Sequence, residues 1–213
     1  MKKTLSDFVK AVLAGICIGL GGSVFLALLP TDRIFGAVLF TVGLFTICTQ
    51  NFNLFTGKAC GLLEHKPSYI GCLAVIWLGN LAGTALTAQL IRLTRQAANI
   101  AAAAQSLIAV KNADSLLSLF VLGVLCNVLI YIAVDGFKNI PHELGKYLAL
   151  FLGVAVFILA GTEHSIANMF YYAMAGELLS AQALVRILTV TLGNMVGGLI
   201  FPAGNILLKT LDA

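Results

Sequence analysis

Short polar stretches divide the chain into six apolar segments, each long enough to cross a bilayer. A membrane-spanning helix needs about 20 mostly apolar residues. The segments run approximately over residues 8–29, 34–63, 68–93, 115–134, 145–175 and 181–208. We therefore predict an all-α membrane protein with six transmembrane helices in a single domain over residues 1–213. A polar, alanine-rich connection, ending near Asp114, joins the third and fourth helices.

The second and fifth segments are each about 30 residues long, more than one span requires. Polar residues interrupt both near the middle, as "TQNFNLFTGK" at 49–58 and "GTEHSIAN" at 161–168. Non-helical backbone at membrane depth is tolerated only where protein buries it or where it lines a cavity. The second and fifth helices are therefore predicted to be broken. Ionisable residues at this depth are costly, so Glu163 and His164 indicate a functional site.

The two halves of the chain repeat. "LGNLAG" at 78–83 returns as "LGNMVG" at 192–197, and "VLAGIC" at 12–17 returns more weakly as "VLGVLC" at 121–126. Each half, 1–95 and 115–213, holds three spans, and an odd number places the second copy upside down in the membrane. This 3+3 inverted repeat is typical of transporters whose site lies where two broken helices meet. Asn80 and Asn194 occupy equivalent positions, and we expect them to bind free backbone groups of the broken helices.

Composition excludes several classes of protein. The chain is 60% hydrophobic and 10% charged, whereas a soluble domain has about 25% charged residues. Its net charge is +4, and the basic residues are scattered along the chain without a basic run that would suggest binding to nucleic acid. The five cysteines lie in apolar segments without a C-x-x-C pair, so we interpret them as small buried residues rather than disulfides or metal ligands. Lysine and arginine are slightly more frequent on the side shared by both termini, which favours cytoplasmic termini.

The two breaks resemble a known family. "NLFTG" in the second segment, "GTEHSIANMF" in the fifth and "LGN-x-x-G" in the sixth resemble the formate/nitrite transporter family, with the motifs in the family's order along essentially the whole chain. The resemblance implies an aquaporin-like fold, a homopentamer with one pore per protomer, and no cofactor. It also implies a protein of the inner (plasma) membrane, with both termini cytoplasmic, that moves small monovalent anions such as formate, nitrite or hydrosulfide.

Carried over position by position, the resemblance implies a central pair, His164 and Thr56, that handles the substrate and a proton. It makes Lys111 the residue that attracts anions before the fourth span. The supporting polar residues are Glu163, Asn127, Asn168 and Asn194. The candidates for apolar constrictions are Leu54 and Phe55 from the motif, with Phe40, Leu44, Leu148 and Phe157 chosen by their distance along the helices.

An apolar pore poses a physical problem for an anion, because leucine and phenylalanine offer no replacement for water. Falling dielectric in a vestibule favours the neutral form of a weak acid. We therefore expect the anion to become protonated there and to cross as the neutral acid, so that the net flux is anion plus proton. His164, with an ordinary pKa near 6.5, hands over a proton or holds the substrate together with Thr56.

Other interpretations of single residues stay open at this point. His164 can also be a helix-to-helix hydrogen-bonding residue, and Lys111 an ordinary loop lysine. Glu163 fits a structural role, accepting hydrogen bonds from the broken-helix backbone, better than a substrate ligand. Lys58 either attracts anions from the cytoplasmic side or extends its ammonium group to the membrane interface.

Two other functions are compatible with a polytopic membrane protein. An aquaporin-like pore for neutral solutes shares the architecture but needs an N-P-A motif in each half, and the chain has none. A membrane-embedded enzyme needs a nucleophile with its base or a set of metal ligands. The sequence contains neither H-E-x-x-H nor G-x-S-x-G.

Overall fold

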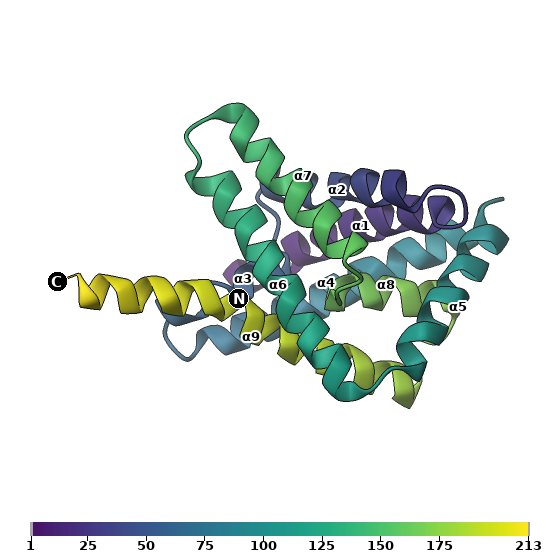
Figure 1. Cartoon of the computed structure of the whole chain (residues 1–213). Helices are drawn as coiled ribbons and strands as arrows, with labels where there is room; N and C mark the ends of the chain where they lie inside the picture. Colours follow the sequence, from purple (N-terminus) through teal and green to yellow (C-terminus); the bar gives the residue numbers. More distant parts are fainter. Residues whose placement is uncertain (1, 213) are drawn as a thin grey trace.

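The computed structural model describes residues 2–212, which form helices and no strand. The α-helices are α1 (Lys2–Leu28), α2 (Arg33–Thr49), α3 (Phe55–Ala59), α4 (Tyr69–Arg92), α5 (Ala97–Ala113), α6 (Leu116–Asn139), α7 (Glu143–Leu159), α8 (Ser165–Ala175) and α9 (Ala181–Leu211), with a 3-10 turn η1 (Leu62–Glu64) after α3. Four of them, α1, α4, α6 and α9, are long and apolar enough to cross a bilayer. Figure 1 shows the helices packed into one bundle, with α5 beside α8 at its right side.

The two predicted breaks are present. Residues 50–54 separate α2 from α3, and residues 160–164 separate α7 from α8. Both breaks contain a residue in the left-handed region, Asn51 with φ 56° and Gly161 with φ 69°. Asparagine and glycine adopt this conformation more readily than other residues, so each helix stops where the local sequence allows the chain to turn.

Glycines bring helices of each half into close contact. In α1 and α4, a Cβ added to Gly15 would collide with the Asn80 backbone, and one added to Gly83 would collide with the carbonyl oxygen of Val12. In α6 and α9, a Cβ added to Gly197 would collide with the carbonyl oxygen of Val124. In each pair, residues later in one helix contact residues later in the other, so the two helices run parallel. The small residues allow the backbones to approach closely, as in many membrane helix pairs.

The alanine-rich stretch after the third segment connects α4 to α6, as predicted, and most of it is helical. This helix, α5, packs against α8. Alanine has the highest helix propensity, and this segment carries little of the polar turn chemistry that breaks helices. The helix is held at its end by Arg186 of α9, which donates hydrogen bonds to the carbonyl oxygens of Lys111 and Asn112.

Candidate functional site

The two breaks bring Thr56 and His164 together at the centre of the bundle. Thr56 lies in the first turn of α3, and His164 is the residue that precedes α8. The Thr56 hydroxyl oxygen and His164 Nε2 are 3.0 Å apart, although 108 positions separate the residues in sequence. Both side chains are buried, at 0% and 3% exposed. The structure thus joins the two residues that the sequence motifs proposed as a central pair.

Two asparagines support this junction in the same way. Asn80 of α4 accepts a hydrogen bond from the Phe55 amide and donates to the carbonyl oxygens of Asn53 and Ala11. Asn194 of α9 accepts from the Ser165 amide and donates to the carbonyl oxygens of Glu163 and Gly123. Each side-chain amide therefore binds one backbone group at the end of a break, one at the start of the helix that follows it, and one in a neighbouring helix. The prediction that this repeated pair binds the broken-helix backbone is confirmed.

Hydrogen bonds also define the form of the His164 ring. Its Nδ1 accepts from the Ala167 amide at 3.1 Å, which caps α8. A neutral imidazole has one donor and one acceptor nitrogen, so the proton lies on Nε2 and is donated to the Thr56 oxygen. The Thr56 hydroxyl hydrogen then remains available to a substrate. Protonation of Nδ1 would break the α8 cap, so this geometry favours the neutral ring.

An outer cavity of about 270 Å³ reaches His164 from the end of the bundle where α2 begins. Its lining includes Lys111 and Glu163, whose charged groups form a buried ion pair. Lys111 Nζ lies 2.6 and 2.7 Å from the two carboxylate oxygens, and Asn168 donates to the same carboxylate at 2.6 Å. Lys111 is therefore not a loop lysine, and its charge is neutralised. Arg33 also lines this cavity and forms no ion pair among residues 2–212.

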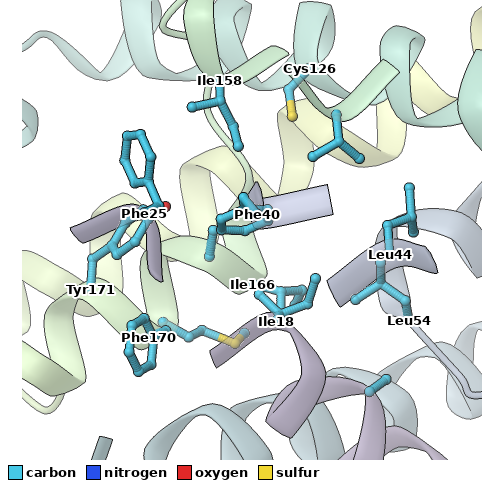
Figure 2. Packing of buried hydrophobic residues seen from close by; sticks show 14 of the residues in the cluster. Ile18, Phe25, Phe40, Leu44, Leu54, Cys126, Ile158, Ile166, Phe170 and Tyr171 are labelled. Carbon is cyan, nitrogen blue, oxygen red and sulfur yellow. The ribbon is translucent and has the colours of Figure 1, made fainter. Parts of the chain in front are cut away.

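An inner cavity of about 180 Å³ lies on the opposite side, where α2 and α6 end. Its walls are mainly apolar and include Leu44, Leu54 and Phe137, and its charged lining residues are Lys58 and Lys138. Buried aromatic and aliphatic side chains separate the two cavities. Figure 2 shows Phe40 between the Phe25 and Tyr171 rings on one side and the Leu44 and Leu54 side chains on the other. The outer cavity thus reaches His164 directly, whereas small molecules in the inner cavity reach the Thr56–His164 region only past apolar side chains.

Comparison with known proteins identifies this arrangement. The sequence profile described as "Formate/nitrite transporter" matches residues 1–207. The chain belongs to the formate/nitrite transporter family. It is 30% identical to a probable formate transporter of Methanothermobacter thermautotrophicus, over 80% of this chain and 72% of that protein. It is equally 30% identical to the nitrite transporter NirC of Escherichia coli K12, over 92% of this chain and 81% of that one.

Solved structures agree with the family assignment. A pentameric formate channel with formate bound superposes with a TM-score of 0.85 at 26% identity, over 99% of this chain and 98% of that chain. An FNT family ion channel superposes with a TM-score of 0.80 at 27% identity, over 92% and 87%. The chain is therefore an integral membrane channel or transporter for small anions rather than an enzyme.

The polar residues taken from the family motifs lie around the two breaks, and one of their predicted partners was wrong. Asn127 donates to the carbonyl oxygens of Thr56 and Asn194, linking the two breaks. Glu163 accepts from Lys111 and Asn168 instead of the broken-helix backbone, so that part of the prediction was wrong. A carboxylate can accept several hydrogen bonds, and a lysine brought in by α5 is the stronger partner in an apolar setting.

The apolar constriction residues were located less well. Phe40, Leu44, Leu54 and Phe157 are buried, and the Phe157 ring stacks on His164 with centroids 5.6 Å apart. Phe55 is buried but lines neither cavity. Leu148 is 47% exposed and also lines neither cavity, so its selection was wrong. Distance along α7 sets its depth, but packing against α6 turns this position to the outside of the protomer.

Sequence reasoning overlooked Arg33, Phe25 and Tyr171 in the outer cavity and Lys138 in the inner one. None stands in a family motif. Arg33 follows Asp32, whose side chain caps α2 by accepting from the Phe35 amide at 2.8 Å. That capping signal fixes where α2 begins and hence which end of the bundle Arg33 occupies.

Proposed function

We propose that this chain is a formate channel or transporter, with nitrite and hydrosulfide as the alternative substrates. The buried pair formed by Thr56 and His164, which borders the outer cavity at His164 and is separated from the inner cavity by apolar side chains, carries the proposal. It offers a hydroxyl donor to one small oxyanion or its acid. The relatives support this choice, since one is named a probable formate transporter and one superposed structure is a formate channel with formate bound.

The residues suggest how the anion crosses. An isolated anion loses its hydrogen bonds to water between the apolar side chains, and these side chains offer none in return. Formate in a cavity therefore takes a proton from water and becomes formic acid, because low dielectric favours the neutral form. Thr56 donates its hydroxyl hydrogen to the acid's carbonyl oxygen, while His164 Nε2–H orients that hydroxyl. The acid releases its proton in the opposite cavity, so the net flux is one anion and one proton.

We further propose the complete membrane arrangement. Six spans arise if α2 with α3 and α7 with α8 each act as one broken span. Residues 1–95 and 115–213 then form an aquaporin-like inverted repeat, which the equivalent roles of Asn80 and Asn194 support. Both termini lie on the cytoplasmic side of the inner membrane. Five copies assemble as a homopentamer, in keeping with the pentameric state of the superposed formate channel.

Uptake of labelled formate into liposomes that contain the purified protein tests the proposal. Thr56→Val keeps the shape of the side chain but removes the hydroxyl, and His164→Ala removes the ring. His142→Ala is the matched control, because this exposed histidine precedes α7 and makes no side-chain cap. We expect the two site variants to lose most of the uptake and the control to retain it. Uptake of nitrite or hydrosulfide but not formate would overturn the choice of substrate.

A further inference from the structure

Lys58 and Lys138 share the inner cavity although they come from different helices. Lys58 lies in α3, two positions after Thr56, and Lys138 lies in the last turn of α6. The other lining residues are neutral, and Leu44, Ile47 and Val134 supply apolar wall. Neither lysine forms an ion pair in the described part of the chain, residues 2–212. Two ammonium groups thus border a half-enclosed space that contains no carboxylate in its lining.

Nearby carboxylates face adjoining hollows and have other partners. Asp7 accepts a hydrogen bond from Asn53 at 3.1 Å, and Asp135 accepts one from Asn139 at 2.8 Å. Asp7 lines a hollow next to the α4 start that Lys58 also borders, and Asp135 lines one next to η1, together with Glu64, that both lysines border. The lining of the inner cavity therefore includes two lysines and no carboxylate, whereas these carboxylates border the adjoining hollows.

We propose that Lys58 and Lys138 form a binding station for one small monovalent oxyanion at the inner mouth of the pathway. This inference deepens the proposed function and rests on it. Like charges in a shared cavity repel, and an anion between them removes that repulsion. Clefts lined by one sign of charge also raise the local concentration of counter-ions by about 10- to 1000-fold. A cavity of about 180 Å³ is ample for a molecule the size of formate.

The station stands directly before the central step. Leu54, which lines the same cavity, precedes Thr56 by two positions in the chain. The backbone at Lys58 is held in place, since the Tyr69 hydroxyl donates to its carbonyl oxygen at 3.3 Å. An anion bound by the two lysines therefore waits next to the apolar constriction. The outer cavity differs, because Glu163 neutralises the charge of Lys111 there. Arg33 lines the same cavity and has no carboxylate partner in residues 2–212.

Cys48 makes the station measurable without any transport assay, because its thiol lines the same cavity. The background protein keeps Cys48 and carries alanine at the other four cysteines, Cys17, Cys60, Cys72 and Cys126. Detergent-purified protein is treated with methanethiosulfonate reagents that carry an anionic sulfonate or an uncharged group. The ratio of the two rates reports the potential in the cavity and cancels changes in the reactivity of the thiol itself.

We expect Lys58→Gln together with Lys138→Gln to lower the anionic-to-neutral rate ratio by about tenfold. Millimolar formate should slow the anionic reagent in the background protein but not in the double variant. Lys58→Arg with Lys138→Arg should keep both effects, since the charges remain. Lys146→Gln is the matched control, because this lysine lies at the same end of the bundle, lines neither cavity and pairs with Glu143 at 3.3 Å.

An unchanged rate ratio in the double glutamine variant would overturn the station, and so would a lack of protection by formate in the background protein. A drop of equal size in Lys146→Gln would assign the potential to the whole face and also refute it. These outcomes are separate from a failure of the proposed function, which would appear as absent formate uptake in liposomes. Retained pentamer mass on gel filtration shows that each variant is folded.

Discussion

Removing the carboxylate of Glu163 should strongly destabilise the protein. Lys111 and Glu163 are only 10% and 7% exposed in their side chains, and both carboxylate oxygens contact the ammonium group. Deleting one partner of a buried pair leaves the other charge uncompensated, at a cost of about 3–5 kcal/mol. Glu163→Gln keeps an oxygen for Asn168, so we expect a loss near the lower end, about 3 kcal/mol.

The second half of the experiment separates the pair from its surroundings. Lys111→Met removes the charge but keeps a long apolar side chain, and buried pairs replaced as a whole are often nearly neutral in stability. The double variant Lys111→Met/Glu163→Gln should therefore be more stable than Glu163→Gln alone, by about 2 kcal/mol. Each variant is unfolded by sodium dodecyl sulfate in mixed micelles, and circular dichroism monitors the transition. The fit gives the free energy of unfolding of each variant. Additive losses in the double variant would refute the reasoning.

Three further predictions concern packing, the breaks and the outer cavity. Asn194→Ala leaves the Ser165 amide and the Glu163 carbonyl without partners, at about 1–3 kcal/mol each before relaxation; a loss below about 1 kcal/mol in the same unfolding assay, or one equal to that of half-buried Thr189→Ala, would contradict this role. Gly197→Ala should abolish folded protein on gel filtration because its Cβ meets the Val124 carbonyl oxygen, whereas Gly204→Ala, with nothing within 4 Å, should be tolerated; equal yields would show that the close contact is not needed. Arg33→Gln should lower formate uptake at low concentration severalfold and weaken its salt dependence, whereas an unchanged salt dependence would remove Arg33 from the attraction of anions.

Much of the fold follows from the sequence because the membrane restricts the choices. The apolar runs and the polar interruptions at 49–58 and 161–168 gave the helices and both breaks within a few residues. Asn80 and Asn194 were predictable from the repeat, since broken helices leave backbone groups that need partners. The sequence analysis predicted the connection before the fourth span but not its helical form, α5, although alanine favours a helix.

The lining of the cavities was harder to predict because it depends on how each helix is rotated by its neighbours. Leu148 and Phe157 lie on the same helix, α7, but only Phe157 turns toward His164. The role of Lys111 depends on α5 packing beside α8, which brings Lys111 to Glu163 although 52 positions separate them in sequence. Lys58 and Lys138 line one cavity because α3 and α6 pack together, and nothing in the spacing of their sequence positions indicates this.

The most direct test of the account measures whether a proton crosses with the anion at Thr56 and His164. Purified protein is placed in liposomes that contain a pH-sensitive dye, and formate is added outside with the membrane voltage clamped to zero by potassium and valinomycin. The account predicts rapid acidification of the interior with the unchanged protein and little with Thr56→Val, while His142→Ala behaves as the unchanged protein does. Formate entry that depends on an applied voltage and leaves the interior pH unchanged would show movement of the bare anion and contradict the account.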